Sequence, residues 1–426
     1  MVDLTKMDRG DLQARAQRLD ERYLRFKALG LVLDMTRGKP CAEQLDLSLG
    51  LLDCLGQNDY RAADGSDCRN YGGLEGLPEA RKLFAEFLEV DPSEVIVGGN
   101  SSLAMMHDTL TQAVLRGMPG GTAAWRTQPA VKFLCPSPGY DRHFAICQHL
   151  GIDMLTVGMN ANGPDMDEVE PLVAADASIK GIWCVPKYSN PTGITFSDDV
   201  VERLARMRTA APDFRIFWDN AYTVHHLTET PDRLANLFAA CKAVGHADRV
   251  LIFGSTSKVS FAGAGVAAMA ASAANVRHLK SGMAIQTIGP DKLNQLRHVR
   301  FFRDMAGIAA HMQKHAGILR PKFSAVEEVL TRELGGTGVA GWSRPRGGYF
   351  VSLDTPDGCA KAVVAMAADA GVQLTQAGAT FPHGRDPRDR NIRLAPSLPP
   401  LDEIKQALEL VAVCVQRVSI AQLLNR

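Results

Sequence analysis

The sequence predicts an α/β protein with two parts: a large domain on a mainly parallel, doubly wound sheet, and a smaller α/β domain formed by both chain ends. Two observations predict it. Short apolar runs alternate with helical patterns through the middle of the chain, which is typical of a parallel sheet covered by helices. Beyond residue 290 this alternation gives way to long helical patterns and a few short strands. We therefore expect an N-terminal segment of the small domain over 1–60, the large domain over 61–310, and the rest of the small domain over 311–426.

Six apolar runs are predicted to be strands, because each ends in a turn rich in Gly, Pro, Ser or Asn. They are 94–100, 131–140, 152–159, 179–193, 214–222 and 249–258. Helical patterns lie between them, such as 197–211, which opens with Ser197 as an N-cap and acids in its first turn. In such sheets the functional loops follow the carboxyl ends of the strands.

The two chain ends carry the pattern of the smaller domain. Residues 291–334 are typical of one or two long helices, 347–354 and 391–397 of strands, and 360–370 and the stretch from about 401 of helices. Near the N-terminus, apolar residues recur at spacings of four and three, which predicts an amphipathic helix that packs on a core or a partner subunit. They are Leu12, Ala16, Leu19, Tyr23 and Phe26.

Composition is that of a soluble globular protein. The 426 residues are 46% hydrophobic and 22% charged, with 47 Lys and Arg against 47 Asp and Glu, so no global charge favours nucleic acid or a membrane surface. The nine cysteines are scattered without a CxxC pair, which predicts neither a metal site nor a disulfide framework. The charged N-terminus lacks the apolar core of a signal peptide, and the charge-free run around Lys258 is too rich in Ala, Gly and Ser to span a membrane. We expect a cytoplasmic location.

Lys258 is the only charged residue between Arg249 and Arg277. A lysine after a strand is ordinarily a solvated turn residue, but this apolar neighbourhood does not describe a solvated loop. Polar residues end three successive predicted strands: Asn190 in "YSNPTG", Asp219 and Tyr222 in "WDNAY", and Ser255, Ser257 and Lys258 in "STSK". An aldehyde cofactor needs a lysine for a Schiff base, an acid for its pyridine nitrogen, and donors for its phenolic oxygen and phosphate. All these residue types occur here in order.

These motifs, with 33–52, 71–85, 136–143 and 255–267, resemble the fold-type I enzymes dependent on pyridoxal phosphate. Within them, the chain resembles the class I/II aminotransferases, and specifically the bacterial subgroup called type Ic aspartate aminotransferases. The resemblance implies that Lys258 forms the Schiff base and then moves a proton between the substrate α-carbon and the cofactor C4′ carbon. It also implies that Asp219 pairs with the pyridinium nitrogen, that Asn190 and Tyr222 bond the phenolate oxygen, and that Tyr140 stacks on the ring.

The resemblance also implies a phosphate site. "GGNSSLAMMHDTL" supplies backbone amides ahead of a helical run, at Gly99, Asn100, Ser101 and Ser102. Ser255 and Ser257 would add hydroxyls. Tyr71 resembles the tyrosine that reaches the phosphate from a neighbouring subunit, which implies a homodimer with shared active sites. Many class I relatives carry an arginine soon after the lysine, whereas this chain has none before Arg277, so we assign no residue to that role.

On the substrate side, Arg393 in "NIRLAPS" matches the family's α-carboxylate arginine, whose planar fork suits a carboxylate. Asn190 is also a candidate substrate-binding residue. A second carboxylate needs another cation. Arg37 in "TRGKP" and Arg142 in "GYDRH" are the candidates, and Lys39, or Arg297 from the other subunit, are alternatives. His225 and His226 follow the cofactor loop, and we assign them packing rather than a chemical role.

The resemblance implies transamination of an amino acid, L-aspartate or L-glutamate, with a 2-oxo acid by a ping-pong cycle. Another enzyme on the same cofactor, such as a β-lyase, decarboxylase or racemase, is the alternative, because it would share the lysine, the aspartate and the arginine. A distant alternative is a transcription regulator with an aminotransferase-like domain. The short neutral segment ahead of residue 33 leaves no room for the winged-helix reader that such proteins carry there.

Overall fold

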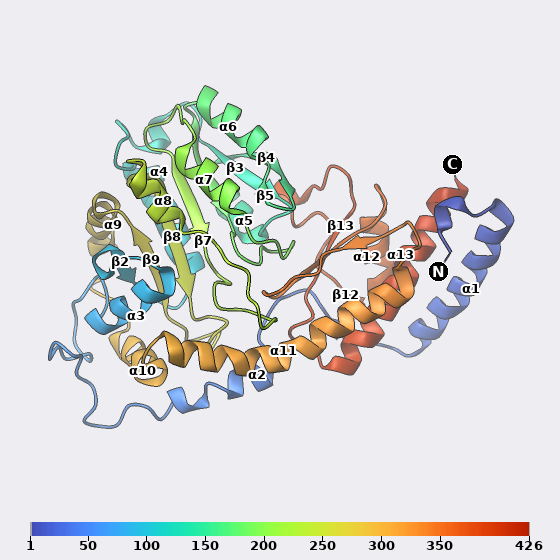
Figure 1. The fold of residues 1–426 in the computed structure, drawn as a ribbon, viewed down its shortest axis with the longest axis horizontal. Helices are drawn as coiled ribbons and strands as arrows, with labels where there is room; N and C mark the ends of the chain where they lie inside the picture. The colour runs from blue at the N-terminus through green and yellow to red at the C-terminus, as the bar shows by residue number, and fades with distance from the viewer. Residues whose placement is uncertain (1, 426) are drawn as a thin grey trace.

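The computed structural model describes residues 2–425 and contains an eight-stranded sheet at its larger end (Figure 1). The strands lie in the order β2 (Val95–Val97), β9 (Ala267–Ala271), β8 (Val250–Ser255), β7 (Arg215–Asp219), β6 (Ile179–Cys184), β3 (Lys132–Ser137), β4 (Asp153–Asn160) and β5 (Gly163–Pro164). Strands β8, β7, β6, β3 and β4 are parallel, and β9 and β5 are antiparallel to their neighbours. The predicted α/β class and the six predicted strands are confirmed.

Helices cover both faces of this sheet, so its strands are apolar on both sides. Along β7, Ile216 and Trp218 face one hydrophobic cluster and Phe217 faces the other. The first cluster is completed by α3 (Pro78–Leu88), α6 (Met166–Ala175), α7 (Asp198–Arg206), α8 (Leu237–Ala243) and α10 (Lys292–Phe302). The second is completed by α4 (Ser102–Arg116), α5 (Asp141–His149) and α9 (Ala273–Gln286). Ser197 caps α7 through the backbone N–H of Val200, as predicted.

Strand β9 was not predicted. It consists almost wholly of alanine, a residue depleted in strands, so its local preference gives no strand signal. It forms because it lies buried between β2 and β8, where it pairs antiparallel with both. The ladder partners on each side override the weak local propensity.

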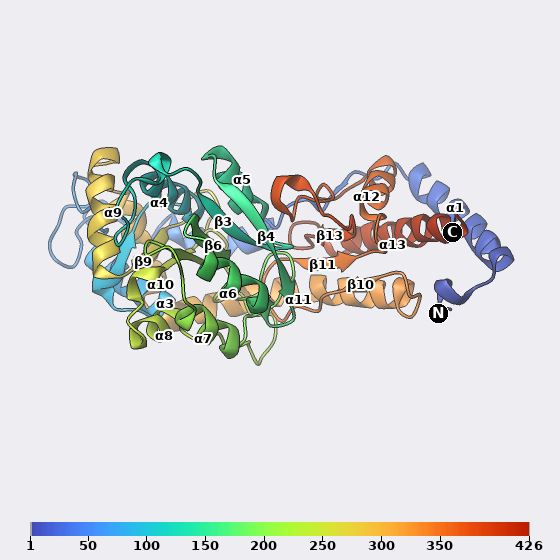
Figure 2. The same ribbon diagram turned by 90° about the horizontal axis from the view of Figure 1, so that it is seen from above.

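A second unit combines the two chain ends. Strands β10 (Gly341–Trp342), β11 (Val351–Asp354) and β13 (Asn391–Leu394) form an antiparallel sheet, and β1 (Leu33–Asp34) pairs with β12 (Val372–Gln373). Helices α1 (Arg9–Ala28), α12 (Ala360–Asp369) and α13 (Leu401–Leu424) complete it, with α1 beside α13 at the far end of the molecule (Figure 2). Leu12, Ala16 and Leu19 of the predicted amphipathic stripe are buried there.

Helix α11 (Met305–Leu334) runs along both units (Figure 1). Ile308 and Met312 belong to a cluster on the large sheet, whereas Leu319 and Leu330 belong to the core of the second unit. The sequence predicted one or two long helices over 291–334, and the structure has two, α10 and α11. The predicted domain boundary at 310 falls inside this continuous helix; the division at 60 and 310 stays a prediction.

Helix α13 is long and apolar enough to cross a membrane by length and composition alone. Of its most apolar window, 61% is buried inside the protein, and it packs against α1 and α11. Its apolar residues therefore form the core of the second unit.

Candidate active site

Lys258 lies in the turn that follows β8, at the carboxyl end of the parallel strands. The turn is closed by the backbone N–H groups of Val259 and Ser260, which donate to the Thr256 carbonyl at 2.9 and 2.8 Å. The Lys258 Nζ lies 5.2 Å from the ring centre of Tyr222 and 5.9 Å from that of Tyr349. Burial lowers the pKa of Lys258 below its ordinary value of 10.5, and the Asp219 carboxylate partly opposes this shift. The neutral amine is therefore more available than in a solvated lysine.

Asp219 is the last residue of β7, the strand next to β8, and its two carboxylate oxygens differ in their hydrogen bonding. Oδ2 lies 3.0 Å from His143 Nε2, whereas Oδ1 is buried and has no hydrogen-bond partner within residues 2–425. His143, on α5, stacks on Trp183 with 4.2 Å between ring centres and 9° between planes. His143 was not predicted from the sequence, because only the fold brings α5 to the end of β7. A buried carboxylate oxygen without a donor is costly, so this atom fits a donor supplied by a bound group.

A cavity of about 240 Å³ collects most of the predicted cofactor residues around Lys258. Its lining includes Asn100, Ser101, Ser102, Tyr140, Asn190, Asp219, Tyr222, Ser255 and Ser257. Burial raises the pKa of Tyr222 and of Tyr140, so both hydroxyls stay protonated and able to donate. Two predicted residues lie outside this lining. Gly99 lines a neighbouring cavity, and Tyr71 is 81% exposed on a loop.

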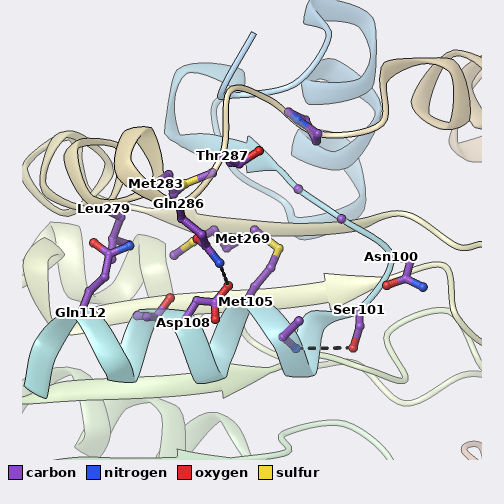
Figure 3. Close-up of a pocket in the computed structure, with 15 residues that line it drawn as sticks. Asn100, Ser101, Met105, Asp108, Gln112, Met269, Leu279, Met283, Gln286 and Thr287 are labelled. Atoms are coloured by element: carbon purple, nitrogen blue, oxygen red, sulfur yellow. Dashed lines mark hydrogen bonds between the residues drawn. The ribbon is translucent and has the colours of Figure 1, made fainter. Parts of the chain in front are cut away.

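One end of this cavity meets the N-terminus of α4. Ser101 caps the helix, its Oγ accepting from the backbone N–H of Ala104 at 3.4 Å (Figure 3). The Ser255 hydroxyl donates to Ser257 Oγ at 3.0 Å, and the Ser257 hydroxyl donates to the Asn100 carbonyl at 3.1 Å. Among the described residues lining the cavity, Lys258 is the only cation. Hydroxyls, backbone amides and the positive end of the helix dipole are therefore the groups here that suit an anion.

Beyond the capping serine lies the neighbouring cavity, of about 340 Å³, between α4 and α9 (Figure 3). Its walls are mostly apolar, with Met105, Met269 and Met283, and a hydrogen bond of 2.6 Å from Gln286 Nε2 to Asp108 Oδ2 crosses one side. A Cβ on Gly99 would meet no atom within 4 Å, so packing within this chain does not demand glycine at that position.

A third cavity, of about 520 Å³, adjoins the first and shares Tyr140, Asn190, Tyr222 and Lys258 with it. Besides Lys258, the structure brings four basic residues to its lining: Arg37, Lys39, Arg142 and Arg393. Arg297, on α10, is not among the lining residues. The cavity lies between the large sheet and the second unit, since Arg393 comes from β13 and Arg142 from α5.

Arg393 is only 6% exposed and is held on one side. Its Nη1 donates to Asp141 Oδ1 at 2.8 Å and to Asn190 Oδ1 at 3.3 Å, and its guanidinium lies 5.0 Å from the ring centre of Phe350. The Nε of Arg393 is buried without a partner in the described part of the chain. Asp141 was not predicted as a partner of Arg393, because 252 residues separate the two along the chain.

Comparison with known proteins agrees with this geometry. The family model described as "Aspartate amino-transferase" matches residues 5–426. An aspartate aminotransferase of Corynebacterium glutamicum is 46% identical over 93% of this chain and 92% of its own length. The crystal structure of an aspartate transaminase from that organism superposes with a TM-score of 0.97 and 44% identity, covering 99% of each chain.

A more distant structure is similar in fold alone. It is the α-aminoadipate aminotransferase LysN of Thermus thermophilus, complexed with N-(5′-phosphopyridoxyl)-L-leucine. Its TM-score is 0.75 at 21% identity, and the match covers 94% of this chain and 95% of LysN.

The fold and these comparisons define an enzyme of the pyridoxal-phosphate-dependent aminotransferases of fold type I. Within that class, the chain belongs to the aspartate aminotransferase family. The resemblance inferred from the sequence motifs is confirmed.

The residues present fit the cofactor that the family implies. The unpartnered Asp219 Oδ1 matches the need of a protonated ring nitrogen for an acceptor, and the N-terminus of α4 matches the need of a phosphate for donors. The amine with the lowered pKa lies in the same cavity.

Proposed function

We propose that this enzyme is an aspartate aminotransferase that transfers the amino group of L-aspartate or L-glutamate to a 2-oxo acid in a ping-pong cycle with pyridoxal phosphate. One observation carries the proposal. Lys258 lines two adjoining cavities. The first contains Asp219 Oδ1, which has no hydrogen-bond partner among the described residues, and the second has a cationic lining that includes Arg393. The amine is therefore within reach of a cofactor on one side and a carboxylate substrate on the other.

Pyridoxal phosphate, when bound, supplies an electron sink for the substrate α-carbon. Lys258 would hold its aldehyde carbon covalently and then, as a free amine, take and return the proton at the substrate α-carbon. Asp219 Oδ1 would accept from the ring nitrogen, with His143 holding the other carboxylate oxygen in place. Asn190 and Tyr222 would bond the phenolic oxygen, and Tyr140 would cover the ring.

The phosphate would be held at the N-terminus of α4, by the backbone and hydroxyls of Asn100, Ser101 and Ser102 and by Ser255 and Ser257. Gly99 would leave the approach to this loop open. The large exposure of Tyr71 supports a role outside its own chain, as a phosphate ligand in a second subunit. We therefore propose a homodimer with shared active sites.

Arg393 would bind the substrate α-carboxylate, with Asn190 beside it. Arg37 and Arg142 are the candidates for the distal carboxylate of a dicarboxylic substrate, since both line the same cavity as Arg393, and Lys39 is an alternative for the same reason. Besides Lys258, four basic residues line this cavity against one carboxylate, that of Asp141, so the excess of positive charge favours dicarboxylic over neutral substrates. The composition is ordinary for a soluble globular protein, and we propose that this enzyme acts in the cytoplasm.

The test is a half-reaction screen. The cofactor-loaded protein is mixed with single amino acids, and the conversion of pyridoxal to pyridoxamine phosphate is followed by absorbance. We expect conversion with L-aspartate and L-glutamate, and a loss of at least about 10³-fold in rate in Lys258→Ala, which lacks both the covalent link and the acid–base group. Pyridoxamine formation by that variant at the parent rate would contradict the role of Lys258.

The same screen separates the alternatives. A β-lyase would release pyruvate, ammonia and the leaving group from an amino acid with a leaving group on its β-carbon, such as L-cysteine, without forming pyridoxamine. A decarboxylase or racemase would give carbon dioxide or the D-amino acid. A regulator would bind DNA in a mobility-shift assay, and we expect no shift at physiological salt because the net charge of the chain is zero.

A further inference from the structure

The turn that carries Lys258 is surrounded by buried histidines that the proposed chemistry does not use. His225 Nε2 lies 3.3 Å from the Lys258 carbonyl, His311 Nε2 lies 2.8 Å from the Val259 carbonyl, and His298 Nε2 lies 2.8 Å from Ser260 Oγ. These histidines are 3%, 6% and 2% exposed. Three consecutive residues of the turn are thus each contacted by an imidazole from a different part of the chain.

His311 also begins a path toward the second unit. His315, one turn further along α11, places its Nε2 3.0 Å from His311 Nε2. Its Nδ1 lies 2.9 Å from the side-chain amide nitrogen of Gln44, which also donates to the Tyr349 hydroxyl at 2.8 Å. Gln44 belongs to α2 (Ala42–Asp46) and is fully buried. Because the Tyr349 ring faces the Lys258 amine, the path starts at the backbone of the turn and returns to its side chain.

Some groups along this path can only donate a hydrogen bond and others can only accept one, and these groups determine which ring nitrogens carry hydrogen. The Cys41 backbone N–H donates to Gln44 Oε1 at 3.2 Å, which fixes the orientation of the amide. The amide nitrogen can only donate, so His315 Nδ1 accepts and the hydrogen of neutral His315 is on Nε2. The Val259 carbonyl can only accept, so His311 carries its hydrogen on Nε2 as well.

Both Nε2 atoms are therefore donors, so the 3.0 Å contact between them is not a hydrogen bond, and both hydrogens point toward the Val259 carbonyl. The Val259 oxygen has two lone pairs and acts as an acceptor toward His315 as well as His311. An added proton on His315 would have to sit at Nδ1, against the Gln44 N–H. Burial lowers the pKa of His311, and burial and then the neighbouring His311 lower that of His315 to about 4, which agrees with two neutral rings.

We propose that His311 and His315, oriented by Gln44, are positioning residues for Lys258: they clamp the Val259 carbonyl and so fix the turn from which the amine projects. The proposal rests on the role proposed for Lys258. A displacement of about 1 Å at a reacting group costs about 10²-fold in rate, so the support of this turn is a determinant of the reaction. Gln44 and Tyr349 extend the clamp to the N-terminal segment and to the second unit.

The test compares His311→Leu, which removes the donor at similar size, with His311→Gln, whose amide can still donate to the carbonyl. Gln44→Leu is a second variant that leaves α11 unchanged and removes the donor to His315. His246→Leu is the matched control, because His246 Nδ1 also bonds a backbone carbonyl, that of Ala205, but at another place in the fold.

Two readouts are independent of turnover. Hydrogen exchange of residues 256–262 in the cofactor-free protein should quicken about 10-fold or more in His311→Leu and in Gln44→Leu. In the loaded protein, the pH midpoint of the visible absorbance of the Lys258–cofactor link should move by at least about half a unit. We also expect kcat to fall about 10- to 100-fold with a smaller change in KM. His311→Gln should restore most of each value, and His246→Leu should match the parent.

Parent-like exchange and an unmoved midpoint in both Leu variants would overturn the clamp. If Lys258 does not hold the cofactor, the result is different. The parent itself would show no cofactor absorbance that depends on Lys258, while hydrogen exchange of residues 256–262 would still quicken in His311→Leu. If His311→Leu does not fold, Gln44→Leu decides by the same two measurements.

Discussion

At the scale of the residue, the site is defined by buried polar atoms that lack the water or hydrogen-bond partners such atoms ordinarily have. Burial removes much of the solvation of Lys258, and within the described residues Asp219 Oδ1 and Arg393 Nε are buried without a hydrogen-bond partner. Each of these is a local electrostatic cost that a bound group of opposite character would relieve. Two predictions follow from single side chains.

The first prediction concerns the pH at which Lys258 reacts. Because burial lowers its pKa, the neutral amine dominates from a pH below the ordinary 10.5, and covalent capture of pyridoxal phosphate should reach half its limiting rate below that value. Stopped-flow absorbance of the cofactor-free protein over a pH series measures this, with Lys258→Ala as the blank. A midpoint at the ordinary lysine value would show that burial does not act on this amine.

The second prediction concerns the ion pair between Asp141 and Arg393. The Asp141 carboxylate occupies Nη1 of the arginine inside the substrate cavity, so it competes with a substrate carboxylate for the same charge. Asp141→Asn keeps the shape and removes the charge, and we expect KM for L-aspartate to fall about 3- to 10-fold with little change in kcat.

The control for that variant is Asp167→Asn. Asp167 is also in the first turn of a helix, α6, and pairs with Arg203 outside the site, so its neutralisation should leave KM unchanged. A higher KM in Asp141→Asn would mean that Asp141 orients Arg393 rather than competing for it.

At the scale of the element, the position of the site depends on how closely the central strands pack. Gly181 lies in β6, where an added Cβ would approach the Phe133 ring to 2.4 Å and the Arg215 carbonyl to 2.9 Å. Neither the buried ring nor the backbone of β7 can move freely, since both belong to neighbouring strands. The lack of a side chain at this position lets three strands of the site lie together.

We therefore expect Gly181→Ala to destabilise the protein by about 1–3 kcal/mol through overpacking, seen as a lower urea midpoint. Gly317→Ala is the matched control. Gly317 lies in α11 with no atom within 4 Å of the added Cβ, so the change should stabilise by up to about 1 kcal/mol through helix propensity. Equal midpoints for the two variants would contradict the packing argument.

At the scale of the whole molecule, the question is whether one chain makes a complete site. Tyr71 is 81% exposed and lies outside the cavity that holds the other predicted cofactor residues. Ile285 and Ile288, 85% and 62% exposed, lie in α9 and in the loop that follows it. Large exposed apolar side chains of this kind are typical of a surface that another protein covers.

If Tyr71 serves a second subunit, Tyr71→Ala should weaken retention of the cofactor about 10- to 100-fold, the range of a lost hydrogen bond to a charged group. Hybrids with Lys258→Ala should then recover one native site per dimer, and about half the parent activity, while each variant alone stays low. Co-expression with two affinity tags and light scattering would measure this. Hybrids no more active than Tyr71→Ala alone would indicate self-contained sites.

The prediction from sequence was strongest where local pattern and local chemistry agree. Apolar runs followed by turn residues predicted six strands, and the structure contains all six. Parallel strands bring their carboxyl ends to one edge of the sheet, and the residues predicted there line one cavity: Asn190, Asp219, Tyr222 and Lys258. Strand β9 was not predicted, because alanine is depleted in strands and gives no local signal. Gly99 was expected to line the cofactor cavity, but it lines the neighbouring one.

The sequence by itself determined the α/β class and six strands of the large sheet, and it predicted a lysine and an acid for a cofactor, because these features show in periodicity or in the residue that ends a strand. Only the tertiary structure decided which distant groups meet them. His143 reaches Asp219, Asp141 reaches Arg393, and His311 reaches the Lys258 turn across separations of 76, 252 and 52 residues. No local pattern encodes such pairs, since they arise from the packing of whole elements.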